Sequence, residues 1–119
     1  EQARRDRRRA NRRGRAAEVL AAIYLLATGH RVIARRFKTP VGEIDLIAVK
    51  RGRIAFVEVK QRATLADCEA AITGETRQRV RRAADWWLAR QPRYQSYDLG
   101  FDLMFLPPWQ RPVYLRDAL

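Results

Sequence analysis

Two acidic residues and a lysine lie in two neighbouring apolar segments, and their spacing could bring three charged groups together. The segments, residues 43–50 and 53–60, read as two short strands joined by a two-residue turn. In an antiparallel pair with this turn, Asp45 lies opposite Glu58, and opposed residues project from the same face with Cβ atoms about 5 Å apart. Lys60 follows Glu58 by two positions and shares that face. The three groups are therefore expected to converge.

Such a group of charges in an apolar sheet has to be neutralised. Two ionised carboxylates at this separation repel each other by about 3 kcal/mol at an effective dielectric constant of roughly 20. In the purely structural interpretation, Lys60 neutralises Asp45 and Glu58 in a cross-strand ion cluster. One ammonium leaves a buried negative charge, so we favour a divalent metal site. Oxygen ligands without a nearby Cys or His predict Mg²⁺ or Mn²⁺ rather than Zn²⁺.

A helix that could carry a third carboxylate precedes the two strands. It is predicted over residues 14–29, with Gly29 as its C-terminal cap. Its apolar residues lie on nearly every side, which predicts that the helix is buried. Glu18 is its only charge after Arg15. A lone carboxylate on a buried helix needs a cation or hydrogen bonds, so Glu18 is either a member of the metal site or an ion-pair partner of an arginine.

The remaining elements complete an α/β pattern. The segments 43–50 and 53–60 are apolar on both faces, which is typical of central strands covered on both sides. The resulting order, αβββαβ with a short last strand, predicts a mixed β-sheet flanked by helices. The further predicted elements are strands over 30–37, 97–106 and 113–115, a helical turn over 65–72, and a helix over 74–90 whose core face is Val80, Ala83, Ala84 and Trp87.

The charge of the chain indicates the class of its partner. The sequence has 25 Lys and Arg against 13 Asp and Glu, a net charge of +12, and a pI near 11.3. A surface this basic attracts polyanions, so we expect nucleic acid as the partner, ahead of a membrane surface or another acidic partner. No apolar run approaches the roughly 20 residues that span a bilayer, and we expect no membrane partner.

The length of 119 residues fits one domain, which we place at residues 14–119. Residues 1–13 carry seven arginines and almost no apolar side chains, so we expect a disordered basic arm. The single cysteine, Cys68, cannot form an internal disulfide, which fits a reducing compartment. We therefore expect the cytoplasm.

The amino-acid sequences of the two strands resemble those of a known family. GEIDLIA at residues 42–48 and FVEVKQR at residues 56–62 resemble the YraN-like family of small bacterial proteins. That family is similar to the PD-(D/E)XK, restriction-endonuclease-like nucleases, and among them to archaeal Holliday-junction resolvases. The resemblance covers residues 14–119, including AAE at 16–18 and FD at 101–102. One departure is Arg77, which stands where the family usually has a lysine.

The resemblance implies a role for each site residue. Asp45 and Glu58 would bind the metal with the carbonyl oxygen of Val59, and Glu18 would be an outer or second-metal ligand. The cation would polarise the scissile phosphate and lower the pKa of the attacking water. We expect Lys60 to orient the hydroxide and stabilise charge rather than accept a proton, because two carboxylates favour its ammonium form.

The expected function is metal-dependent hydrolysis of phosphodiester bonds in DNA, with a structured or branched substrate implied by the family. The alternatives are a non-catalytic nucleic-acid-binding protein with the same fold and a nuclease directed at RNA. Trp86 is equally consistent with stacking on a base and with a contact in a homodimer. The residues expected to contact nucleic acid are Arg12, Arg13, Arg15, Arg62, Arg77, Arg79, Arg82 and Trp86.

This interpretation predicts that binding to nucleic acid weakens steeply as the salt concentration rises, because arginines replace condensed counterions. Deletion of residues 1–13 should weaken binding further. A filter-binding titration at several salt concentrations measures both effects. An affinity that does not change with salt would remove the argument for a polyanionic partner, whereas an unchanged affinity after the deletion would exclude only the arm.

Overall fold

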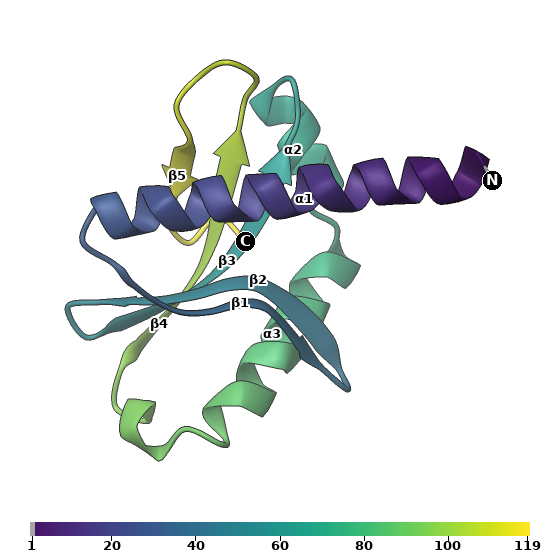
Figure 1. Cartoon of the computed structure of the whole chain (residues 1–119). Coiled ribbons are helices and arrows are strands. Elements are labelled where there is room, and N and C mark those ends of the chain that lie inside the picture. Colours follow the sequence, from purple (N-terminus) through teal and green to yellow (C-terminus); the bar gives the residue numbers. More distant parts are fainter. Residues whose placement is uncertain (1) are drawn as a thin grey trace.

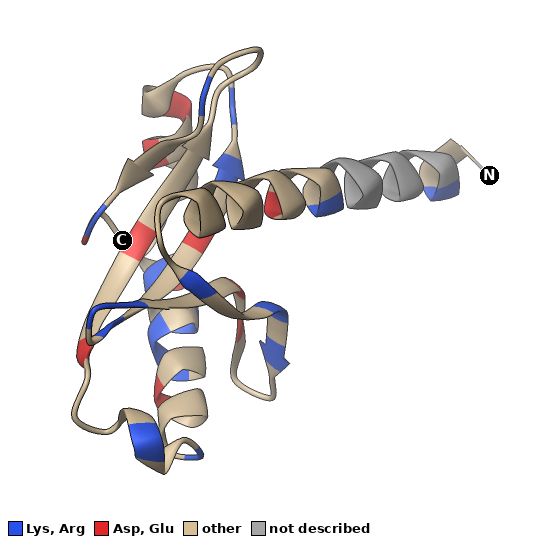
Figure 2. Ribbon diagram, turned by 60° about the vertical axis from the view of Figure 1, so that its left-hand side comes forward, with Lys and Arg blue, Asp and Glu red and all other residues tan. Residues whose placement is uncertain are grey.

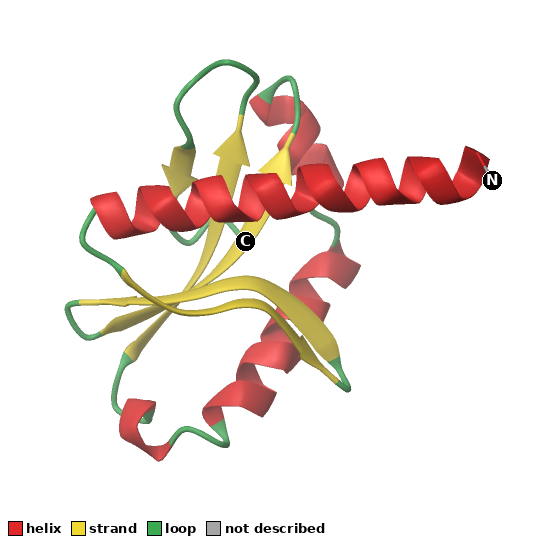
Figure 3. Ribbon diagram, in the orientation of Figure 1, coloured by secondary structure: helices red, strands yellow, loops and turns green. Residues whose placement is uncertain are grey.

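The computed structural model describes residues 2–119, except for the side chains of residues 5–13. One five-stranded sheet forms the centre, with helices on both sides (Figures 1 and 3). No described helix has both the length and the apolar character that crossing a membrane requires. The elements in chain order are α1 (Gln2–Ala27), β1 (Arg31–Thr39), β2 (Gly42–Lys50), β3 (Arg53–Gln61), α2 (Leu65–Ala71), α3 (Gly74–Leu88), the 3₁₀ turn η1 (Pro92–Tyr94), β4 (Asp98–Leu106) and β5 (Val113–Leu115).

The sheet is mixed and its strands follow the order β1-β2-β3-β4-β5. Only β3 and β4 pair in parallel, and the segment that connects them contains α2, α3 and η1. The remaining neighbours pair antiparallel. This is the α/β architecture that the sequence predicts, and it is compatible with a restriction-endonuclease-like fold.

The two faces of the sheet are covered by different helices. On β3, Ile54 and Phe56 pack in the cluster that contains the α3 side chains, whereas Ala55 and Val57 pack in the cluster that contains α1. The predicted core face of α3 is buried at all four positions. The apolar character of β3 on both faces is thus explained, because each face has its own helix.

Helix α1 covers the sheet with one side only. Apart from Leu25, its buried residues are small, and Ala17, Ala21 and Ala22 let the helix lie close to Ala48 and Ala55 of the sheet. The expectation that α1 is buried on every side is wrong, because the sheet contacts a single face and no described element covers the other. The apolar residues on the outer face, between 42% and 59% exposed, are Val19, Leu20, Ile23 and Leu26.

The N-terminal boundary of α1 also differs from the expected one. The helix begins at Gln2, so the predicted start at Gly14 lies within it. The contacts expected of Arg12 and Arg13 fall on side chains outside the described residues, and nothing tests the predicted arm at 1–13 as a separate unit. They stay predictions.

A buried carboxylate joins β3, β4 and β5 to the C-terminal segment. Asp102 is fully buried and accepts hydrogen bonds from Nη1 and Nη2 of Arg53, at 2.8 and 2.7 Å. It also accepts the hydroxyl of Tyr114 and, at 2.8 Å, the backbone N–H of Asp117. Burial alone would raise the pKa of Asp102, but these donors together lower it below its ordinary value. Asp102 is therefore the acceptor of a complete network.

Gly100 makes room for this network. A Cβ atom at position 100 would lie 1.8 Å from Nη2 of Arg53, so a larger residue would displace this guanidinium from Asp102. The glycine in β4 is therefore required by the close approach of the guanidinium rather than by its own backbone angles.

We predict that Asp102→Asn destabilises the protein by about 3–5 kcal/mol, since it leaves the guanidinium of Arg53 without its counter-charge. Asp98→Asn, an exposed change on the same strand, should stay within about 0.5 kcal/mol of the wild type. Urea denaturation of the three proteins measures the difference. Equal stability of Asp102→Asn and wild type would mean that the network does not stabilise the fold.

Candidate active site

The site forms where β2 and β3 separate. Their backbone ladder runs from Lys50–Arg53 to Leu46–Val57, which confirms the predicted register. It stops one residue short of Asp45, so the predicted direct pairing of Asp45 with Glu58 is not formed. Oδ2 of Asp45 instead accepts the backbone N–H of Val59 at 2.8 Å. A side chain thus satisfies the donor that the departing strand leaves, and a fork opens between the strands.

The fork contains a cavity of about 440 Å³ that collects most of the predicted site. Asp45 comes from β2, three of the lining residues come from one turn of α1, and the others follow one another along the end of β3. The complete lining is Gly14, Ala17, Glu18, Asp45, Glu58, Val59, Lys60, Gln61 and Arg62. The convergence of Asp45, Glu58 and Lys60 that the sequence predicts is therefore found in the structure.

Glu58 is the most perturbed acid of the site. It is 6% exposed, and Nζ of Lys60 lies 3.3 Å from its Oε1. Burial, followed by the charge of Asp45, raises the pKa of Glu58 to about 7 even though Lys60 acts in the opposite direction. One ammonium does not neutralise both carboxylates.

The pKa of Asp45 is also raised. Burial is the main cause of its raised pKa, and the Val59 N–H and Lys60 offset it only in part. Arg79 of α3 contributes from outside the cavity, since its charge lowers the pKa of both Asp45 and Glu58. The carboxylate pair is therefore short of positive charge in spite of two nearby cations.

Glu18 reaches the cavity from α1 and is also paired. Its Oε2 lies 3.4 Å from Nε of Arg36. Burial and the charge of Asp45 raise the pKa of Glu18, against the effect of Arg36. Of the two roles that the sequence left open, the ion pair is present in the structure, and metal ligation stays a prediction.

A second hollow adjoins the first on the far side of Glu18. It is lined by Arg15, Glu18, Val19, Arg35 and Arg36. The sequence reasoning did not select Arg35 or Arg36. The register of β1 shifts between Val32 and Ala34, and Arg36 has a left-handed backbone with φ of 51°. This irregular backbone depends on tertiary packing and cannot be predicted from a pattern in the sequence.

The other residues expected to contact nucleic acid are more dispersed. Arg62 lines the cavity, and Arg79 and Arg82 lie exposed on α3. Arg77 lies in a different hollow with Leu103 and Leu115, so it does not belong to this site. Figure 2 shows that basic and acidic positions both occur on helices and on strands, so the basic side chains do not form one separate face.

The ring of Trp86 is less accessible for stacking than the sequence suggested. Its ring lies 6.0 Å from that of Phe37, and the guanidinium of Arg90 covers it at 3.7 Å from the ring centroid. Stacking on a base would require Arg90 to move, so this role stays a prediction.

The donor atoms fit a hard divalent cation. Asp45 and Glu58 offer carboxylate oxygens, and relief of their shortage of positive charge would favour cation binding. In residues 2–119, as far as they are described, no group of three or more His, Cys, Asp or Glu is close enough to hold a metal ion. The protein would therefore provide two carboxylates with the carbonyl oxygen of Val59, and water would complete the shell, as is usual for Mg²⁺.

The raised pKa of Glu58 predicts a pH dependence of stability without metal. The native carboxyl binds its proton up to about pH 7, whereas the unfolded chain releases it near 4.5. The stabilisation is thus complete below pH 4.5 and is lost as the pH rises through 7. Relative to Glu58→Gln, the wild type should lose up to roughly 3 kcal/mol between about pH 5 and pH 8.

Urea unfolding of both proteins with a chelator, at intervals across this pH range, measures that difference. A difference that stays constant with pH would show that Glu58 titrates normally.

Comparison with known proteins gives the family of the chain. Residues 17–106 match the family described as "Uncharacterised protein family UPF0102". A UPF0102 protein of Rhodopseudomonas palustris strain BisB5 is 49% identical over 88% of this chain and 80% of its own length. A UPF0102 protein of Bradyrhizobium diazoefficiens is 46% identical over 95% of this chain and 85% of its own. A third, from Chelativorans strain BNC1, is 45% identical over 98% and 94%. These matches confirm the YraN-like resemblance, and the chain belongs to family UPF0102.

Proposed function

We propose that this protein is a nuclease that hydrolyses phosphodiester bonds in DNA with the help of Mg²⁺ or Mn²⁺, and that it prefers structured or branched DNA. The observation that best supports this proposal is the convergence of Asp45, Glu58 and Lys60 in one cavity at the fork between β2 and β3. A sheet that only had to be stable would gain nothing from two buried carboxylates with raised pKa values.

In this proposal Asp45 and Glu58 hold the cation, together with the carbonyl oxygen of Val59. When bound, the cation supplies Lewis-acid activation of the phosphate and of an attacking water. The hydrogen bond from Val59 fixes the orientation of the Asp45 carboxylate before any ligand arrives. Preorganisation of this kind avoids reorganisation during the reaction.

Lys60 is proposed to stabilise negative charge on the phosphate. Its ammonium lies in the same cavity as both carboxylates, 3.3 Å from Glu58. Arg62 lines the same cavity one residue beyond Gln61 and could hold a second phosphate oxygen. The carboxylates and the two cations thus present opposite charges to one phosphodiester group.

Glu18 and the adjoining hollow extend the proposed site. In this proposal Arg15, Arg35 and Arg36, which line the hollow beyond Glu18, bind further phosphates of the strand. Arg36 is held by Glu18 in this structure, so a ligand that engages Glu18 would release the guanidinium for a phosphate. Three arginines of the chain thus lie beside the proposed site.

A non-catalytic nucleic-acid-binding protein is the second candidate. The pairs Lys60–Glu58 and Arg36–Glu18 show that two of the three acids already have a cationic partner. If these pairs persisted with nucleic acid bound, the basic surface would bind and the acids would serve only the fold.

Cleavage assays separate the two candidates. With Mg²⁺ or Mn²⁺, the wild type should cut labelled branched or duplex DNA, and a chelator should stop the reaction. Asp45→Asn and Glu58→Gln should reduce cleavage to background, and Lys60→Ala should slow it by about 100- to 1,000-fold. Lys38→Ala, which removes an exposed lysine, is the matched control and should cut at the wild-type rate.

The same experiment includes single-stranded DNA and RNA, since cleavage of RNA alone would favour the RNA-directed alternative. Binding of all substrates without cleavage of any, under both metals, would leave the non-catalytic candidate.

Thermal melts give an independent readout. A divalent cation that binds only the native state should stabilise the wild type and Lys60→Ala by about 3 kcal/mol at a hundredfold excess over Kd. Asp45→Asn and Glu58→Gln should lose this response. A wild type whose melting temperature does not change across millimolar metal would contradict the metal site.

A further inference from the structure

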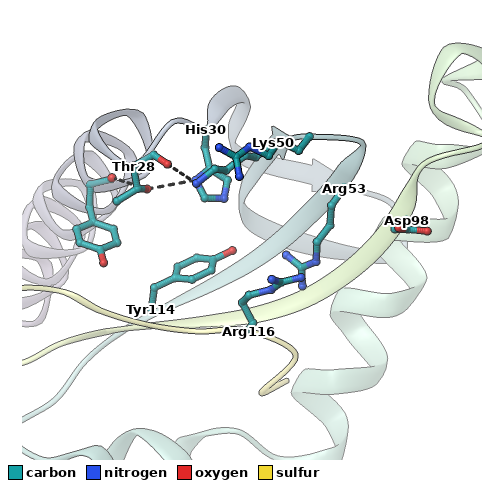
Figure 4. A pocket seen from close by; sticks show the side chains of 9 residues that line it. Thr28, His30, Lys50, Arg53, Asp98, Tyr114 and Arg116 are labelled. Carbon is teal, nitrogen blue, oxygen red and sulfur yellow. Dashed lines mark hydrogen bonds between the residues drawn. The ribbon is translucent and has the colours of Figure 1, made fainter.

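A separate cavity lies at the other end of the β2–β3 hairpin, on the face of the sheet that α1 covers. Its volume is about 470 Å³, within the range of small-molecule sites. It shares no lining residue with the cavity at the fork. From Asp45 to Lys50 the chain advances five residues along β2, or about 17 Å. The lining, shown in Figure 4, is Tyr24, Thr28, His30, Lys50, Arg51, Arg53, Asp98, Tyr114 and Arg116.

Four cations line this cavity against one carboxylate, Asp98. Arg53 is held by Asp102 and Asp117 and is the fixed part of the wall. Among the described residues, no carboxylate lies within 4 Å of the charged group of Arg51 or Arg116. In Figure 4 the side chains of Arg53 and Arg116 point toward the same part of the cavity. Because Arg53 is already paired with two carboxylates, the guanidinium of Arg116 is the one that remains for an anion in this space.

Lys50 is positioned by the end of α1. Its Nζ donates to the carbonyl oxygen of Thr28 at 2.6 Å. Gly29, with φ of 91°, ends the helix, and a Cβ atom there would lie only 3.4 Å from Cε of Lys50. The lysine thus lies against the C-terminal end of the helix, where a positive charge is favoured.

Arg51 occupies a backbone conformation that arginine rarely adopts. Both residues of the β2–β3 turn have left-handed backbones, with φ of 49° at Arg51 and 75° at Gly52. Two-residue turns of this type strongly prefer Asn, Asp or Gly at the first position. Backbone strain at a cation that lines a cavity points to a role of that residue in binding.

Aromatic rings form the opposite wall. The rings of His30 and Tyr114 lie 5.7 Å apart and are tilted by 50°, and the hydroxyl of Tyr114 is fixed by Asp102. Tyr24 of α1 adds a third ring. Burial, followed by the charge of Lys50, lowers the pKa of His30, so its ring is neutral at pH 7 and suited to contact a base.

We propose that this cavity binds one nucleotide unit, with its phosphate between Arg51, Arg116 and Lys50 and its base against the rings of Tyr24, His30 and Tyr114. A single phosphate would leave the aromatic wall unused, and an apolar ligand would leave the arginines unpaired. The site is distinct from the proposed hydrolytic centre and requires no metal. The unit could be a free mononucleotide or the phosphorylated end of a strand, since both present the same groups.

The test is an amide NMR titration of the full chain, with chelator present. The probes are inorganic phosphate, a 5′-mononucleotide, and a trinucleotide with and without its 5′-phosphate. We expect the mononucleotide to bind more tightly than phosphate and to shift residues 24–30, 50–53 and 114–116. A phosphorylated trinucleotide that binds more tightly than the mononucleotide would identify a strand end as the ligand, and the reverse order a free nucleotide.

Variants make the assignment specific. Arg51→Ala and Arg116→Ala remove exposed side chains and should each weaken mononucleotide binding about tenfold. Arg111→Ala, another exposed arginine, should bind as the wild type does, and so should Glu58→Gln. The second control separates this proposal from the nuclease, because it removes a metal ligand and leaves the nucleotide site intact.

Three results would overturn the proposal. The first is shifts confined to residues 45 and 58–62, and the second is equal affinity for phosphate and mononucleotide. The third is unchanged affinity in both Arg51→Ala and Arg116→Ala. Loss of cleavage in the nuclease assays would not affect it.

Discussion

The hydrogen bond from the Val59 N–H to the Asp45 carboxylate determines how the two central strands meet. Beyond Leu46 and Val57 the backbone ladder ends, and β3 would be left with a buried donor lacking an acceptor. Asp45 provides that acceptor from its side chain, so the strands can separate without an unsatisfied N–H. The cavity that opens is lined by one turn of α1 and by the end of β3. The candidate site thus exists because one carboxylate replaces a backbone carbonyl.

Two buried carboxylates, Asp102 and Glu58, lie one residue pair apart in the same sheet, and their pKa values are shifted in opposite directions. Asp102 pairs in register with Val57, and Glu58 pairs with Leu103. Asp102 has a bidentate arginine, a tyrosine hydroxyl and a backbone N–H, and its pKa falls. Glu58 has one lysine and a neighbouring acid, and its pKa rises to about 7. The first acid is fully satisfied by the fold, whereas the second, when ionised, is only partly neutralised by Lys60. This contrast is the physical basis for treating Glu58 as functional.

Much of this arrangement could be predicted from local patterns. The turn at Arg51–Gly52 fixes the register of the hairpin, and the register brings Asp45, Glu58 and Lys60 to the same cavity. The apolar period of α3 gave its core face, and prolines 107 and 108 follow the end of β4. These features depend on spacing within a few residues, which the sequence displays directly.

The rest depends on contacts between distant segments. The orientation of α1 could not be predicted, because apolar residues surround the helix and only the sheet decides which of them are buried. The pair Arg36–Glu18 requires the irregular backbone of β1, and the network of Asp102 joins residues from three strands and the C-terminal segment. The cavity beside the turn likewise combines the end of α1, the hairpin and β5. No periodicity encodes such combinations.

Calorimetric titration of Mn²⁺ at pH 7, in two buffers of different ionisation enthalpy, tests the central claim most directly. With the pKa of Glu58 at about 7, part of the population is protonated, so cation binding must release protons into the buffer. We predict saturable binding whose heat depends on the buffer, and much weaker binding without proton release in Glu58→Gln. The absence of binding at millimolar Mn²⁺, or equal affinity and equal proton release in Glu58→Gln, would contradict the proposal that Asp45 and Glu58 form a metal-binding pair.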